Sequence, residues 1–214
     1  MPAVRTILCF GDSNTYGYIP GSGGRYEAGQ RWPRRLEMLL GEGHEVLEEG
    51  LNGRTIAFTD NIEPYRCGSD HILPCMLSHA PVDLLIVMLG TNDTKDRYHV
   101  KAEEIGYGLE ELILKVLSCR QLQDRPPQIL ILSPVPLGSM DGCIEFSEAS
   151  RQKSLRLPAV YAQTAKDLGC HFFEAGSVVP QPGCDNIHLA PEAHDALARA
   201  LAPLVRQILD QSGR

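Results

Sequence analysis

The chain has 214 residues, of which 43% are hydrophobic and 22% are charged, and this balance excludes an intrinsically disordered chain. Its 27 acidic residues outnumber its 20 Lys and Arg residues and give a net charge of −7, which argues against a nucleic-acid or anionic-membrane partner, because phosphate groups are bound by clustered basic residues. The length predicts a single domain over residues 1–214 with a loop insertion near residues 134–150.

Short apolar runs alternate with helical patterns along the chain. In chain order, strands are expected at residues 6–10 (TILCF), 45–49 (EVLEE), 84–88 (LLIVM), 128–133 (QILILS) and 171–174 (HFFE). Apolar residues at helical spacing predict helices at residues 31–40, 105–117, 155–168 and 191–209. Near-continuous apolar strands that alternate with helices indicate a parallel sheet covered on both faces. We therefore expect a three-layer α/β/α fold of flavodoxin-like size, with about five parallel strands.

Small polar residues gather just after these strands and just before the last helix. They are Gly11-Asp12-Ser13, the Gly50–Thr55 stretch that contains Gly53, Gly90-Thr91-Asn92-Asp93, and Asp185-Asn186-Ile187-His188. Ligands of open parallel sheets bind beyond the carboxyl ends of the strands, so these segments are the candidate site. The carboxylates of Asp12 and Asp93 are expected to accept loop N–H groups and thus to be structural.

These residue types are sufficient for nucleophilic catalysis. A serine such as Ser13 becomes a nucleophile when an imidazole takes its proton, and His188 and Asp185, three residues apart, can supply the imidazole and its carboxylate partner. The Ser13 and Gly53 N–H groups and the Asn92 side-chain amide are candidate donors to an oxyanion. Together they form a complete set of groups for a serine hydrolase.

The same four blocks, in the same order, resemble those of the SGNH (GDSL-type) hydrolase family. Longer stretches, ILCFGDSNTYG at residues 7–17 and VMLGTNDTK at residues 87–95, are similar to the small bacterial aryl esterases and acyltransferases of that family. The resemblance implies a serine esterase or acyltransferase for short-chain carboxylic esters. It also implies water or an alcohol as acyl acceptor, an acyl-enzyme on Ser13, and neither cofactor nor metal ion.

Two kinds of alternative stay open. The same triad serves carbohydrate O-acetylesterases and lysophospholipases or thioesterases. A more distant alternative is a flavodoxin-like module in which residues 13–15 bind the phosphate of FMN, but this would leave Asp185 and His188 without a role.

The substrate contacts are predicted from position alone, and we expect them at Asn14, Tyr16 and Trp32. The histidines other than His188, among them His71 and His79, show no metal-ligand spacing, so no metal site is expected. Seven scattered cysteines without a CxxC pair are typical of a reducing compartment and predict a cytoplasmic protein.

The segment at residues 134–150 is too irregular to be a helix or a strand, and long loops of this kind are usually functional. It carries five large apolar side chains, Val135, Leu137, Met140, Ile144 and Phe146. This is more apolar surface than a solvated loop is expected to expose, so we predict that the loop pairs between subunits of a homo-oligomer and narrows the entrance to the site.

Overall fold

The computed structural model describes residues 4–119, 121–122 and 125–212, which contain a five-stranded parallel sheet. The strands are β1 (Arg5–Gly11), β2 (His44–Gly50), β3 (Leu84–Met88), β4 (Gln128–Ser133) and β5 (His171–Glu174). Their order across the sheet is β2-β1-β3-β4-β5. The chain therefore reverses its direction of winding between β1 and β3, which is the point where such sheets bind ligands.

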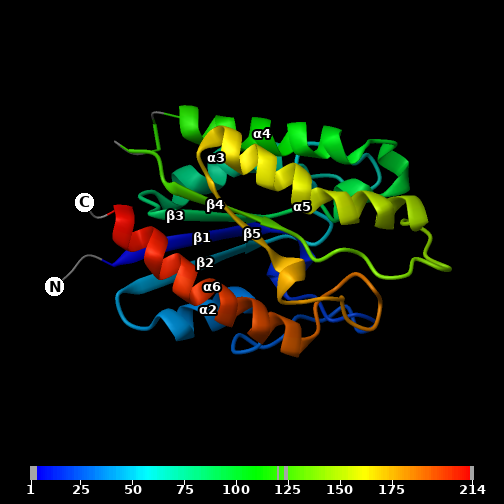
Figure 1. The fold of residues 1–214 in the computed structure, drawn as a ribbon, viewed down its shortest axis with the longest axis horizontal. Helices are drawn as coiled ribbons and strands as arrows, with labels where there is room; N and C mark the ends of the chain where they lie inside the picture. Colours follow the sequence, from blue (N-terminus) through cyan, green and yellow to red (C-terminus); the bar gives the residue numbers. More distant parts are fainter. Residues whose placement is uncertain (1–3, 120, 123–124, 213–214) are drawn as a thin grey trace.

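Helices cover both faces of the sheet and confirm the predicted three-layer α/β/α fold (Figure 1). On one face α2 (Trp32–Leu40) packs against α6 (Pro191–Ser212). The other face is covered by α3 (Gly68–His79), α4 (Ala102–Ser118) and α5 (Glu148–Leu168). No helix in the described part of the chain combines the length and apolar character needed to cross a membrane.

Alternate residues of β1 enter two different hydrophobic clusters. Ile7 and Cys9 lie in the cluster under α2 and α6, whereas Leu8 and Phe10 lie in the cluster under α3, α4 and α5. All four are fully buried, because successive strand residues point to opposite faces and both faces are covered. This explains why the strand is a continuous apolar run rather than an alternating one.

All four predicted helices are present, and the largest differences from the predictions concern α3 and α5. The sequence pattern does not predict α3, because Pro74 interrupts the helical spacing and proline lacks the N–H that a helix interior needs. Helix α5 begins at Glu148 rather than at residue 155, because the Ser147 side chain accepts the N–H of Ala149 and caps an additional stretch of helix.

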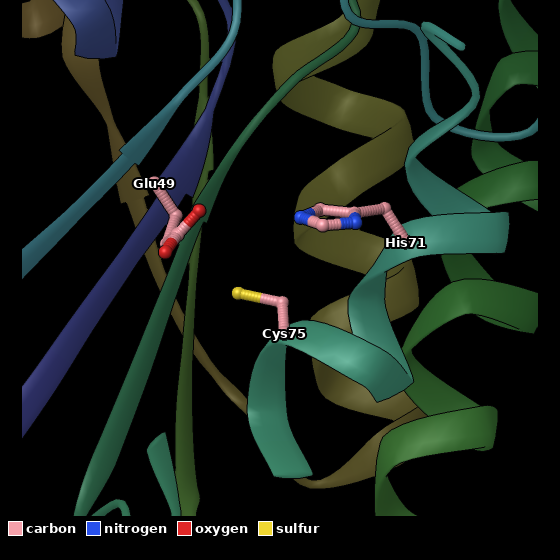
Figure 2. A group of neighbouring side chains, drawn as sticks. All are labelled: Glu49, His71 and Cys75. Carbon is pink, nitrogen blue, oxygen red and sulfur yellow. The ribbon is translucent and has the colours of Figure 1, made fainter. Parts of the chain in front are cut away.

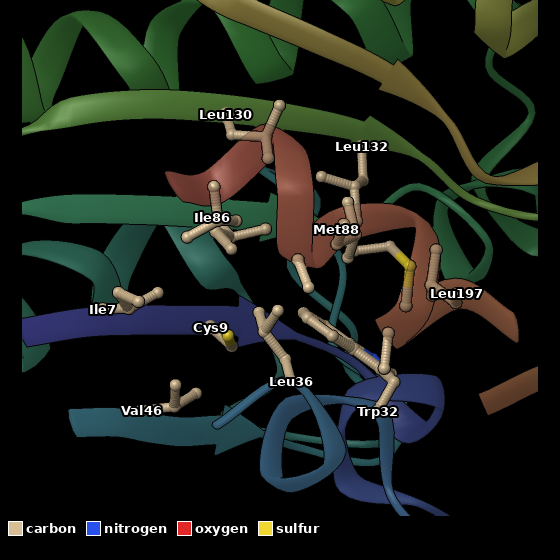
Figure 3. Close-up of a cluster of buried hydrophobic side chains, with 14 of the residues drawn as sticks. Ile7, Cys9, Trp32, Leu36, Val46, Ile86, Met88, Leu130, Leu132 and Leu197 are labelled. Atoms are coloured by element: carbon tan, nitrogen blue, oxygen red, sulfur yellow. The ribbon is translucent and has the colours of Figure 1, made fainter. Parts of the chain in front are cut away.

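Trp32 lies in the hydrophobic core and not at the candidate site. Its side chain is fully buried at the start of α2, in the same cluster as Leu36 and Leu197 (Figure 3). This position contradicts the prediction that Trp32 contacts the substrate. The side chain instead fills the space between α2, α6 and the sheet, where burial of a large aromatic ring stabilises the fold.

The connection between β4 and α5, residues 134–147, folds onto its own chain. Leu137, Met140 and Phe146 are buried and form a small cluster with Ile187. The expectation of an exposed apolar loop is therefore wrong for these side chains. Ile144 is the exception, with 98% of its surface exposed.

Candidate active site

The end of β1 positions Ser13. Immediately after Gly11 the chain turns into α1 (Ser13–Tyr16), a single turn of helix. A side chain at position 11 could not be accommodated, since an added Cβ would lie 2.0 Å from a side-chain oxygen of α1. Asp12 caps the turn by accepting the N–H of Asn14 at 2.9 Å. Ser13 is thus presented at the carboxyl end of β1, between β2 and β3.

The segment before α6 brings an imidazole and a carboxylate to Ser13. His188 Nε2 lies 2.9 Å from Ser13 Oγ, and His188 Nδ1 lies 2.6 Å from Asp185 Oδ2. The other oxygen of Asp185 accepts the backbone N–H groups of Ile187 and His188, at 3.1 and 2.8 Å. The structure therefore joins the three predicted side chains in one continuous chain of hydrogen bonds.

The electrostatics of Asp185 favour this arrangement. Partial burial raises the pKa of Asp185, but the hydrogen bonds from the His188 side chain and from the backbone N–H groups outweigh it and lower the pKa to about 2. The ionised carboxylate stabilises the proton on Nδ1 of His188, so Nε2 faces Ser13 as the acceptor.

Asn14 is a positioning residue for the histidine segment. Its Oδ1 accepts the N–H of Leu189 at 2.9 Å, and its Nδ2 donates to the carbonyl of Ile187 at 3.4 Å. The side chain is buried and does not line the cavity beside Ser13. The prediction that Asn14 contacts the substrate is therefore not supported, because both ends of its amide bind the backbone on either side of His188.

The aromatic residue beside the site is Tyr18 rather than Tyr16. The ring of Tyr16 lies outside the cavity, with the Arg25 guanidinium 4.4 Å from its centroid. Gly17 ends α1 in the left-handed conformation and redirects the chain, so that the ring of Tyr18 lies 4.6 Å from the His188 ring. The predicted substrate contact at Tyr16 is therefore not supported, and Tyr18 lines the cavity in its place.

Two loops bring Gly53 and Asn92 to the cavity that contains Ser13. The loop after β2 holds Gly53 at a φ of 77°, a conformation that favours glycine. Asn92 begins η1 (Asn92–Thr94), a short 3-10 helix after β3, and its Nδ2 donates to the carbonyl of Arg54 at 3.1 Å. A primary amide carries two N–H groups, so one remains for a ligand in the cavity.

Buried charges fix the loop that carries Gly53. Arg54 donates to the carbonyl of Gly11 at 2.9 Å and also to that of Glu49, and its guanidinium lies 4.1 Å from the centroid of the Phe10 ring. Burial lowers the pKa of Arg54 to about 10, which still leaves it charged at neutral pH. The loop is therefore anchored to the ends of β1 and β2.

The cavity beside Ser13 has a volume of about 220 Å³ and a strongly polar wall. Lys95 is 4% exposed, and its Nζ lies 2.9 Å from Glu63 Oε2 and 3.0 Å from Glu145 Oε1. The lining also includes Ile187 and Phe146, whose ring centroid lies 5.8 Å from Lys95 Nζ. The complete lining consists of Ser13, Tyr18, Asn52, Gly53, Glu63, Asn92, Lys95, Glu145, Phe146, Ile187 and His188.

The sequence reasoning missed most of this polar wall. Lys95 had a detectable signal, because it lies three residues after Asn92 in the stretch VMLGTNDTK. Glu63 and Glu145 lie in irregular segments far from the four blocks and carry no pattern that would identify them.

Comparisons with known proteins agree on one family. Residues 9–196 match the model of the GDSL-like lipase/acylhydrolase family. The inhibitor-bound aryl esterase of M. smegmatis is 36% identical, with a TM-score of 0.91 over 96% of this chain and 100% of that one. A carbohydrate acetylesterase from Sinorhizobium meliloti is 35% identical, with a TM-score of 0.89 over 95% of this chain and 99% of the other. Among curated proteins, no sequence matches the chain significantly.

Replacement of Asp93 by Asn should flatten the pH dependence of stability. Burial raises the pKa of Asp93 to about 7, although the N–H groups of Ile56 and Ala57 lower it, and the charge of Asp12 raises it further. The folded state then holds a proton that the unfolded chain, with an Asp pKa near ~3.9, has lost. The free energy of unfolding therefore falls as the pH rises from about 4 to about 7, by up to about 1.4 kcal/mol per pH unit.

Urea unfolding at several pH values in this range measures how steeply the free energy of unfolding falls as the pH rises. Asp93→Asn keeps an oxygen to accept the Ile56 N–H, now bound at 2.8 Å, but removes the ionisation. The slope should become shallower in this variant and should be unchanged in Asp210→Asn, a variant at an exposed position. An unchanged slope in Asp93→Asn would contradict the assignment.

Proposed function

Since this chain belongs to the GDSL-like lipase/acylhydrolase family and is a carboxylic ester hydrolase, we propose that Ser13, His188 and Asp185 are its catalytic triad for short-chain esters. The observation that carries the proposal is the 2.9 Å separation of His188 Nε2 and Ser13 Oγ inside the cavity. The family assignment agrees with the four sequence blocks and argues against the alternative of an FMN-binding module.

In the first half of the reaction, Ser13 Oγ attacks the carbonyl carbon of the ester. His188 Nε2 takes the hydroxyl proton, and the carboxylate of Asp185 stabilises the resulting imidazolium. The tetrahedral oxyanion accepts hydrogen bonds from the N–H groups of Ser13 and Gly53 and from Nδ2 of Asn92, all of which belong to residues that line the cavity.

In the second half, the oxyanion collapses and the bond to the leaving alcohol breaks. His188 returns its proton to the alcohol, which leaves the acyl group on Ser13 Oγ. Water then attacks the acyl carbonyl while His188 takes its proton. The bond between the acyl group and Ser13 Oγ breaks, His188 returns the proton to Oγ, and the carboxylic acid leaves. Every proton in this cycle passes through His188, so the cycle requires no cofactor.

Ser13→Ala should lower kcat for a p-nitrophenyl ester by about 10⁴-fold or more, because the nucleophile is lost.

Asn92→Ala should lower kcat by about 10²–10³-fold with little change in KM, because its hydrogen bond forms mainly in the transition state. Steady-state kinetics measure both, with the exposed Ser22→Ala and Asn61→Ala as controls of near-normal activity. Near-normal kcat in Ser13→Ala would contradict the proposed triad. Near-normal kcat in Asn92→Ala would contradict its role as an oxyanion donor.

The cavity favours a short acyl group and a polar alcohol. Its volume of about 220 Å³ lies below the range of roughly 300–1,000 Å³ that is typical of small-molecule sites. Lys95, Glu63 and Glu145 offer charged hydrogen-bonding groups, which suit the hydroxyls of a sugar. This wall supports carbohydrate O-acetylesterase as a second candidate activity, and the 35% identical acetylesterase adds to that support. A lysophospholipase or long-chain thioesterase role fits such a wall less well.

Lys95→Met separates these substrate classes. We expect kcat/KM for an acetylated sugar to fall about tenfold, the size of one charged hydrogen bond, and kcat/KM for p-nitrophenyl acetate to change much less. Lys166→Met replaces an exposed lysine of α5 and is the matched control. Equal losses on both substrates would contradict sugar recognition by Lys95.

We further propose that residues 1–214 form one domain and that the protein is a cytoplasmic homo-oligomer. Alcohols compete with water as acceptors of the acyl group. Ile144 supports self-association, since it is 98% exposed beside Glu145 and Phe146, which line the cavity. Seven free cysteines support a reducing compartment.

Light scattering at micromolar concentration tests the assembly. We expect a multiple of the 23.5 kDa chain mass, and Ile144→Glu should shift the mass toward that of one chain, because it places a charge in the apolar contact. Ile62→Glu, at a 73% exposed position elsewhere, should leave the mass unchanged. A wild-type mass near 23.5 kDa would exclude the oligomer.

A further inference from the structure

A second cluster of reactive side chains lies outside the cavity. Glu49 of β2 and His71 and Cys75 of α3 bring a carboxylate oxygen, an imidazole nitrogen and a thiol sulfur within 4.8 Å of one another. Figure 2 shows the three side chains converging on one space between the strand and the helix. None of them lines the cavity beside Ser13, so the proposed reaction does not use them.

The histidines and the cysteine of α3 lie on one face of the helix, which is not evident from the sequence. His71, Cys75 and His79 are separated by four residues each, which places them along one face of α3. His79 Nε2 lies 2.8 Å from Glu49 Oε1, so this face is turned toward the end of β2. The sequence showed no metal-ligand spacing at His71 and His79, because its pattern does not predict the helix at residues 68–79.

The three donors match the chemistry of zinc. Zinc binds thiolate, imidazole and carboxylate ligands, whereas Ca²⁺ and Mg²⁺ take oxygen ligands. The thiolate of Cys75 and the carboxylate of Glu49 would balance both charges of the ion. The positive charge of Arg54, which donates to the carbonyl of Glu49, opposes cation binding, so both anions are needed.

The ligands have to move closer together to bind the ion. In tetrahedral coordination, with Zn–S near 2.3 Å and Zn–N near 2.1 Å, two ligand atoms lie about 3.6 Å apart. The separations of up to 4.8 Å therefore have to shorten by up to about 1.2 Å. His71 is exposed and can rotate inward, while Cys75 is buried at 4% exposure and fixes one corner of the site.

We propose that Glu49, His71 and Cys75 form a structural zinc site, with water as the fourth ligand and His79 orienting the Glu49 carboxylate. Binding releases the thiol proton of Cys75 to solvent and forms the Zn–S bond. The ion would connect the end of β2 to α3, directly before the loop that holds Gly53. It would therefore stabilise the strand that leads into this loop and would not take part in ester hydrolysis, because none of its ligands lines the cavity.

Zinc titration of chelator-treated protein tests the site. Calorimetry should detect one Zn²⁺ per chain, and saturating Zn²⁺ should raise Tm, because an ion that binds only the folded state stabilises it. Co²⁺ serves as a spectroscopic probe, since a thiolate-to-cobalt charge-transfer band requires a cysteine ligand. Cys75→Ser should abolish this band, and His71→Ala should weaken zinc binding at least tenfold. His79→Ala should weaken binding by about 10–100-fold, as expected of a residue that orients a ligand.

Control variants distinguish this site from adventitious binding. Cys143→Ser removes an exposed cysteine, and His188→Ala removes the histidine of the proposed triad, so both should retain full zinc binding. His71 is exposed, so loss of binding in His71→Ala with an unchanged Tm of the metal-free protein cannot be attributed to misfolding. The proposal is overturned if wild-type protein binds no zinc, if His71→Ala and Cys75→Ser bind it normally, or if His188→Ala abolishes binding.

Discussion

The position of β1 between β2 and β3 is the constraint on which the candidate site depends. Parallel pairing on both sides aligns the carboxyl ends of the three strands, so the segments after them meet at one edge of the sheet. Ser13, Gly53 and Asn92 follow these three strands, and each lines the same cavity. His188 comes from 175 residues further along the chain and reaches Ser13 because α6 packs with α2 beside β1.

Charged groups behind the cavity hold its loops in place. Arg54 joins the ends of β1 and β2, and Asp93 binds the N–H of Ile56, so the loop that contains Gly53 is attached on two sides. Burial raises the pKa of Asp93 to about 7 and that of Asp12 to about 6, which means that the fold keeps costly carboxyl groups inside the protein. Each carboxyl group accepts at least one backbone N–H group, which would otherwise be a buried donor without a partner.

The accuracy of the sequence predictions depends on local pattern. All five strands are predicted to within one residue at either end. Burial on both faces gives β1, β3 and β4 continuous apolar runs, whereas the edge strands β2 and β5 are only partly buried. Helix α3 is missed, because Pro74 breaks its pattern and only tertiary packing makes the helix favourable. The predicted contacts at Asn14, Tyr16 and Trp32 lie outside the cavity, since proximity to Ser13 along the chain does not decide where a side chain points.

By itself, the sequence determined the fold class, the positions of the strands along the chain and the four blocks that identify the family. These features depend on local residue types and short spacings. Only the tertiary structure decided which side chains surround Ser13. Tyr18 reaches the site through the left-handed turn at Gly17, and Lys95 meets Glu63 and Glu145 through the folding of two irregular loops. The cluster at Glu49 likewise requires β2 and α3 to pack together. Contacts between segments far apart in the chain depend on packing geometry, which no local pattern encodes.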